Sequence, residues 1–321
     1  MTSHTQVGVA RRTRPSPSGA RGDDDASQAE SVIVDGLDET DEVPDLPPSE
    51  APATSDATRA ILLASARRRL VPIRRTFVQL PRNGAREAGR VGPLGRLVEE
   101  RQHVALDLIL LLLALQPIIS ERDPLPGGTW ARLLSSDSAT RSPATVSRTW
   151  AVLENRKLVH RERGRPIQLL REDGSGAAWA HPGEDRDAVG YFSLPRRYWT
   201  DGWHERLRLP GKAMLLILLA ETNTPGSPTF TLPAARIAQH YGLSTSTVKR
   251  GLDELREHGL LDERWQRVPA PRSATGWTYK VHYWLNSPFS TKYREAARKA
   301  DGAEIAAKTK AIAESKSGKQ T

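Results

Sequence analysis

The chain has 321 residues, enough for two ordinary domains and additional tails, and a formal net charge of +9. It contains no cysteine, which excludes disulfides, thiolate zinc sites and a cysteine nucleophile. The charge is uneven, because residues 1–58 hold 12 acidic against 4 basic side chains and the rest holds 43 Lys and Arg against 26 Asp and Glu. A cationic body behind an acidic leader favours a polyanionic partner.

The N-terminal third contains two unlike segments. Residues 1–58 are rich in Ser, Pro, Asp and Glu and contain few large apolar side chains. This composition predicts a disordered leader. Residues 59–101 hold 11 Arg against 3 acidic residues, interrupted by glycines and prolines. This segment is either an arm that lies along phosphates or a loosely packed entry into the first domain, and its spacing does not separate the two.

Three helices and a hairpin are expected next. The apolar run at 105–115 contains Asp107 and is too short to cross a bilayer, so we expect a buried core helix. A short helix at 129–134 follows. Ser142 is a favourable N-cap and Pro143 suits the first helical position of a third helix, after which a hairpin spans 158–170.

The second half is expected to contain similar elements with additional strands. It opens with a strand at 191–195 and aromatic residues, among them Trp199 and Trp203, that are expected to fix the orientation of the two halves. We interpret the eight Trp as core and packing residues. The remaining expected elements are an apolar helix at 212–222, a short strand at Phe230, helices at 233–241 and from Ser244, and strands at 260–268 and 277–285.

Residues 244–261 repeat residues 142–159 at a distance of 102 positions without a gap. Duplication of a unit within a basic chain favours nucleic-acid binding. The identical pairs are Ser142/Ser244, Thr145/Thr247, Val146/Val248, Arg148/Arg250, Leu153/Leu255 and Leu158/Leu260.

From Gly211 to Leu285 the order of helix, strand, helix, tight turn, helix and hairpin resembles the winged helix-turn-helix superfamily, and the first half resembles it more loosely. The layout of residues 104–285 is also similar to theta-type plasmid replication initiators. The expected fold is mainly α with small β wings (α+β): two tandem winged helix-turn-helix domains with a disordered leader and a basic tail. The expected segments are a leader at 1–58, an arm or linker at 59–101, domains at 102–180 and 190–288, and a tail at 289–321, helical but broken at Gly302.

The resemblance places the N-terminal half of the last helix in the major groove of DNA. Val248, Leu252 and Leu255 share the inward face. Arg250 suits a bidentate contact to guanine, whereas Ser244, Thr245 and Lys249 suit phosphates. The expected DNA-binding residues are Ser244, Thr245, Ser246, Thr247, Lys249 and Arg250, with Arg272 near the wing tip.

The equivalent helix of the first half is expected to bury Val146, Trp150 and Leu153. Its candidate DNA contacts are Thr145, Ser147 and Arg148, although winged helices also serve as protein-contact modules. Its hairpin contains Arg-Gly-Arg-Pro, so Arg163 and Arg165 are candidates for the minor groove of A·T-rich DNA, or simply residues of a glycine-containing hairpin tip.

These patterns predict a non-enzymatic protein that recognises double-stranded DNA as a transcriptional regulator, without metal, cofactor or membrane contact. A monomer is plausible, in the cytoplasm and associated with the nucleoid. The alternatives are a theta-type initiator of plasmid or mobile-element replication, a winged-helix scaffold for protein partners, and an enzyme whose site is assembled only in space. No sequence motif of catalysis or metal binding is visible.

Overall fold

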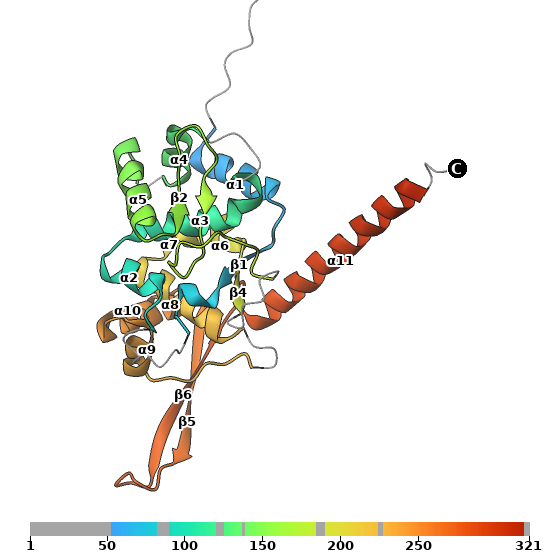
Figure 1. The fold of residues 1–321 in the computed structure, drawn as a ribbon. Coiled ribbons are helices and arrows are strands. Elements are labelled where there is room, and N and C mark those ends of the chain that lie inside the picture. Colours follow the sequence, from blue (N-terminus) through green and yellow to red (C-terminus); the bar gives the residue numbers. More distant parts are fainter. Residues whose placement is uncertain are drawn as a thin grey trace, which may run out of the picture. The chain divides into compact units, whose positions relative to one another are not determined.

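The computed structural model describes residues 53–81, 90–119, 125–136, 139–183, 190–223 and 227–317, with side chains to residue 310 (Figure 1). Nearly all of the leader expected at 1–58 therefore lies outside the described residues, as do residues 82–89 of the expected arm. The described residues form one compact unit of helices and three small two-stranded sheets.

The first half is mainly helical. Its elements are α1 (Ser55–Ser65), β1 (Leu70–Arg74), the short 3-10 helix η1 (Arg75–Phe77), α2 (Pro93–Glu99), α3 (His103–Ile119), α4 (Gly127–Leu133), α5 (Pro143–Asn155), β2 (Val159–His160) and β3 (Gln168–Leu169).

The second half ends in a long hairpin and a long helix. Its elements are β4 (Tyr191–Pro195), α6 (Arg197–Thr200), α7 (Trp203–Arg206), α8 (Leu209–Glu221), α9 (Ala234–Tyr241), α10 (Thr245–Glu257), β5 (Leu261–Pro269), β6 (Trp277–Leu285) and α11 (Thr291–Ser317). The short strand predicted at Phe230 is reduced to a single bridge, in which the backbones of Phe230 and Tyr283 exchange two hydrogen bonds of 2.8 Å.

Helices α3 and α8 are apolar around most of their circumference, and most of their residues are buried, as a helix without a polar face requires. One ion pair joins them: Nζ of buried Lys212 lies 2.5 Å from Oδ1 of Asp107. Among the described residues no helix combines the length and the apolar character needed to cross a bilayer.

The Arg-rich segment is packed rather than extended along the surface. Thr54 caps α1, which therefore begins before the expected end of the leader at residue 58. Arg59 is only 4% exposed and donates to the carbonyl oxygens of Leu133 and Ser135. Strand β1 pairs antiparallel with β4, and all five of its residues are buried. Because apolar residues of α1 and β1 enter the core, the described part of 59–101 is packed into the fold.

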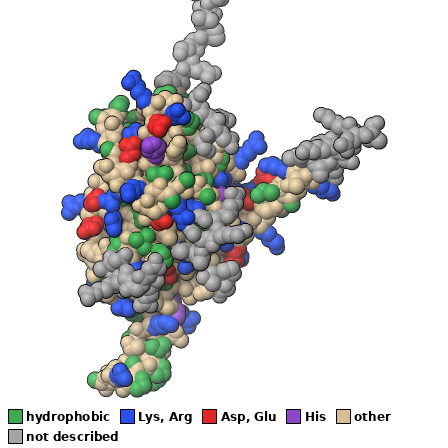
Figure 2. All heavy atoms as spheres, in the orientation of Figure 1, with side chains coloured by type: hydrophobic (Ala, Val, Ile, Leu, Met, Phe, Trp, Pro, Cys, Tyr) green, Lys and Arg blue, Asp and Glu red, His purple; other side chains and the backbone are tan. Residues whose placement is uncertain are grey.

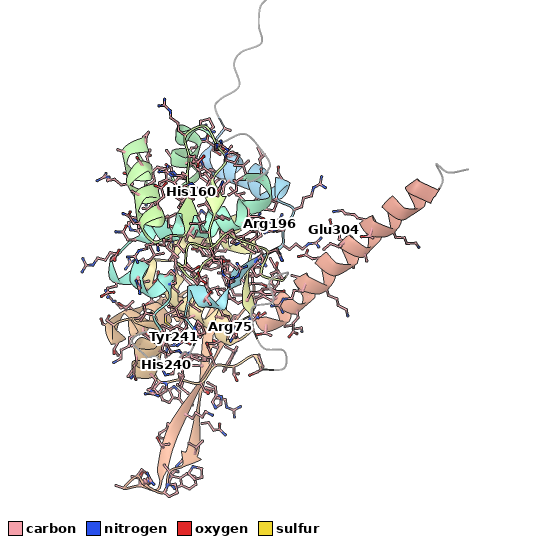
Figure 3. All side chains as sticks on the ribbon, viewed as in Figure 1. Arg75, His160, Arg196, His240, Tyr241 and Glu304 are labelled. Atoms are coloured by element: carbon pink, nitrogen blue, oxygen red, sulfur yellow. The ribbon has the colours of Figure 1, made fainter. Side chains whose placement is uncertain are left out.

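Residues 75–95 also support the second half. The Gln79 side-chain amide donates to the carbonyl of His240 at 2.9 Å, and Arg75 donates to the carbonyl at the end of α8. A Cβ on Gly95 of α2 would lie 2.4 Å from the carbonyl oxygen of Tyr241, so α2 approaches the end of α9 closely. Figure 3 shows Arg75, His240 and Tyr241 near one another. These contacts connect part of the segment expected as an arm or linker at 59–101 with the domain expected at 190–288.

Helix α11 runs from Thr291 through Gly302 to Ser317, so the break expected at Gly302 is absent. Glycine costs a helix only about 1 kcal/mol relative to alanine, and Arg69 stabilises this turn through ion pairs with Asp301 and Glu304. The start of α11 is fixed by buried Arg294, which donates to the carbonyls of Phe289, Leu219 and Thr222. Burial lowers the pKa of Arg294 to about 10, assisted by the neighbouring charge of Arg298.

Candidate nucleic-acid interface

Helix α10 is held against α8 by packing and by capping. Val248, Leu252 and Leu255 are buried, which confirms the inward face expected from their spacing. The Glu254 carboxylate accepts hydrogen bonds from the backbone N–H groups of Arg208 and Gly211, at 2.6 and 3.1 Å, and so caps the first turn of α8. This pair of contacts fixes the orientation of α10.

A close backbone approach reinforces that orientation. A Cβ on Gly251 would lie 2.4 Å from the carbonyl oxygen of Pro210, so only glycine allows α10 to pack this tightly on α8. The tight turn before α10 is made by Gly242, which has a φ of 67° and forms the C-cap of α9. The opposite face of α10 is consequently presented outward.

The first half of α10 carries six of the predicted DNA-binding residues, and all of them reach the surface, Thr247 only partly. The hydroxyl of Ser244 accepts a 3.1 Å hydrogen bond from the backbone N–H of Thr247, as an N-cap should. Nε of Arg250 donates to the carbonyl of Ser246 at 3.3 Å, and Arg250 has no ion pair with any residue described. These residues are Ser244, Thr245, Ser246, Thr247, Lys249 and Arg250.

The hairpin after α10 forms a wing of nine paired residues on each strand, from Leu261 opposite Leu285 to Pro269 opposite Trp277. Arg272 is exposed in the connecting loop, and so lies apart from the α10 cluster along the chain and at the far end of the hairpin. Helix, helix, turn, helix and wing therefore occur in the order that the second half predicted (Figure 1).

Helix α5 presents its surface in the same way. Val146, Trp150 and Leu153 are buried, as expected, while Ser147 and Arg148 are exposed. Thr145 is partly buried, and its backbone N–H donates to the Ser142 hydroxyl at 3.2 Å. Nε of Arg148 contacts the carbonyl of Ala144 at 3.4 Å, which is the contact that Arg250 makes in α10.

The repeat extends to the end of each helix and into each hairpin. Lys157 and Gly259, which are 102 positions apart, both have a positive φ, of 54° and 67°, and close the helix in the same way. The next residues, Leu158 and Leu260, then donate back to the carbonyls of Leu153 and Leu255. From 142 to 160, each residue is as buried as its counterpart except at Arg156, where His258 is more exposed.

An ion pair between helix and hairpin is repeated with its charges exchanged. In the first copy Arg161 forms two hydrogen bonds with Glu154, at 3.0 and 3.1 Å. In the second copy the equivalent positions are Arg256 and Glu263, whose Nη2 and Oε2 atoms are 2.5 Å apart. An ion pair therefore joins helix and hairpin in both copies, although the acidic and basic residues have exchanged positions.

The two copies differ in their turn and wing. Nine residues connect α4 to α5, where Gly242, Leu243 and Ser244 connect α9 to α10. The first hairpin pairs only two residues on each strand. At its tip Arg163 is exposed without an ion pair to a described residue, whereas Arg165 pairs with Glu162 at 3.0 Å.

A cleft of about 1160 Å³ separates the exposed start of α10 from the first half. Its lining includes Arg250 on one side and, from other elements, buried Arg59 and three further arginines that the sequence did not indicate as a group. Each of these three adjoins a helix terminus, but only the fold brings them together at the cleft. They are Arg101, Arg141 and Arg208.

His204 also lines this cleft. Burial, together with the positive charges of Arg59 and Lys212, lowers its pKa to about 3, so the ring is neutral at physiological pH. Within the described part of the chain, no three His, Asp or Glu side chains gather closely enough to hold a metal ion.

Comparison with known proteins gives one match: residues 213–264 match the IclR helix-turn-helix domain. No curated protein and no solved structure matches the chain. The matched segment covers α8 from its fifth residue, then α9, α10 and the start of β5, and it supports a winged helix-turn-helix DNA-binding fold for the C-terminal part. The first half lies outside this match.

Proposed function

We propose that this chain is a non-catalytic transcriptional regulator that recognises a sequence in double-stranded DNA. The observation that carries the proposal is the start of α10. Its apolar face is buried, so the polar and cationic side chains between Ser244 and Arg250 face outward. The match of residues 213–264 to a helix-turn-helix domain supports it.

Within this function, Arg250 reads a base and its neighbours bind the backbone. A guanidinium without an ion pair can make two hydrogen bonds to O6 and N7 of guanine. Ser244, Thr245 and Lys249 contact phosphates near the start of the helix, and the arginines across the cleft extend the phosphate contacts.

The first copy provides a second DNA contact. Its helix α5 repeats the local geometry of α10, and Figure 1 shows both helices on the same side of the view with α2 between them. Arg148 contacts the duplex from α5, and exposed Arg163 enters an adjacent minor groove. Two linked contacts increase affinity through effective concentration, so a monomer can bind an asymmetric site.

The test begins by selecting genomic fragments bound by the full chain and sequencing them to define a site. Binding of that site and its point variants is then measured by fluorescence anisotropy. We expect Arg250→Ala to remove about 1–3 kcal/mol of preference at one base pair. Arg148→Ala tests the first copy in the same assay, and unchanged binding by this variant would limit recognition to α10.

The matched control is Lys299→Ala, which removes one exposed positive charge from α11 and should leave the base preference unchanged. If Arg250→Ala weakens all sequences equally, Arg250 binds only phosphate. A regulator predicts isolated sites at promoters, whereas tandem repeats beside an A·T-rich stretch would indicate a replication initiator. Affinity that does not change with salt would contradict DNA binding and favour a protein scaffold.

A further inference from the structure

The outer half of the β5–β6 wing exposes large aromatic side chains. Trp265 is 60% exposed, Trp277 43% and Tyr279 66%, whereas Val281 and Tyr283 nearer the core are buried. Figure 2 shows hydrophobic side chains gathered at the end of the projecting hairpin. The expectation that tryptophans serve the core is therefore wrong for Trp265 and Trp277, because the strands extend beyond the helices that could cover them.

The strand register places these rings on one face of the hairpin. Trp265 lies opposite Val281, Arg267 opposite Tyr279, and Pro269 opposite Trp277, and directly opposed residues of antiparallel strands share a face. The Arg267 guanidinium carbon lies 4.6 Å from the centre of the Trp277 ring. The Trp265 indole N–H donates to the Glu263 carboxylate at 3.1 Å, which orients that ring.

The charge of the wing selects a polyanion as the occupant of this face. Residues 264–282 contain no Asp or Glu, and their four cations make no ion pair with a described residue. Of these cations Arg267 shares the aromatic face, whereas Arg264 and Lys280 alternate to the opposite face, so a second copy of the wing packed on the aromatic face would bring two Arg267 side chains near one another, which costs energy. The cations are Arg264, Arg267, Arg272 and Lys280.

We propose that this aromatic face binds single-stranded DNA by stacking on unpaired bases, beside the duplex that α10 recognises. Base faces are concealed within a duplex, whose grooves present only base edges, so exposed rings can stack only on unpaired bases. Aromatic rings for the bases combined with cations for the backbone are the features of single-strand binding surfaces. The location beside a duplex rests on the proposed function, whereas the stacking itself does not.

The test compares two single strands of 15 nucleotides, an oligothymidylate and an abasic strand with the same phosphates, by anisotropy with the full chain. We expect the wild type to bind the oligothymidylate at least about 10-fold more tightly. Trp265→Ala and Tyr279→Ala should each lose about 10-fold for the oligothymidylate and little for the abasic strand. Trp265→Phe, which keeps a stacking face, should retain most of the affinity.

Ile61→Ala is the matched control, because Ile61 is exposed on α1, outside the wing. Equal binding of both strands by the wild type would overturn the proposal, as would alanine variants that bind the oligothymidylate normally. Self-association that Trp265→Ala abolishes, without base-dependent binding, would instead assign the face to a second copy. Arg250→Ala should weaken duplex binding alone, so failure of duplex recognition and failure of stacking give different results.

Discussion

The two helix–hairpin copies, residues 142–170 and 244–286, have nearly the same local geometry but different extensions. Both begin with a serine cap, bury the same positions and join helix to hairpin by an ion pair. The second copy adds a tight turn and a long wing, whereas the first has a nine-residue loop and a short hairpin. The helix ends and the buried face are therefore what the two segments share, and the loops are where they differ.

The largest expected effect concerns the ion pair that joins α3 to α8. Asp107→Ala leaves the buried Lys212 ammonium without this partner, and we expect the free energy of unfolding to fall by about 3–5 kcal/mol. Urea denaturation measures this loss. The double variant Asp107→Ala/Lys212→Met should recover much of it, and a single-variant loss below about 1 kcal/mol would show that the pair does not hold the halves together.

An intermediate effect distinguishes the two copies at equivalent positions 149 and 251. Gly251→Ala places a methyl group against Pro210, so we expect a loss of about 1–3 kcal/mol and weaker duplex binding as α10 is displaced. Thr149→Ala removes a hydrogen bond to the Thr145 carbonyl but gains helix propensity, so stability should change by less than about 1 kcal/mol. Thermal unfolding of both variants measures the two losses of stability. Equal losses would contradict the expected difference between positions 149 and 251.

The smallest effect concerns the exchanged ion pairs. Double-mutant cycles with alanine at Glu154 and Arg161, and at Arg256 and Glu263, should each give a coupling of about 0.2–1 kcal/mol, because the four side chains are partly exposed. Chemical denaturation measures all the variants. Coupling in only one copy would mean that the ion pair, although present in both copies, stabilises only one of them.

Helical and alternating periods predicted most of the second half because its elements are neighbours in the chain. The buried face of α10, the serine caps and the strands of the wing follow from local patterns, and the fold of this half agrees with them. The Arg-rich segment was harder to predict, since β1 pairs with β4 about 120 residues later and Arg59 reaches carbonyls at the end of α4. The spacing of residues along the chain does not show which distant segments pair with one another.

The candidate site likewise contains residues that local sequence indicates and residues that only the fold groups. The sequence indicates the six polar residues between Ser244 and Arg250 because they share one helix start, and their roles on DNA stay predictions. The cleft arginines, Arg101, Arg141 and Arg208, come from three separate elements and could not be grouped from spacing. The exposed tryptophans were assigned to the core because composition does not reveal where a strand passes beyond its supporting helices.

The sequence by itself determined the repeated helix with its cap, its inward apolar face and its outward polar face, because hydrogen bonds and side-chain periodicity over a few residues set these features. Only the tertiary structure decided how the copies are connected. Burial of β1, α2 and the Lys212–Asp107 pair between distant segments joins the two halves and places three separate arginines opposite α10. Those contacts form because apolar surface from all parts of the chain must be removed from water together.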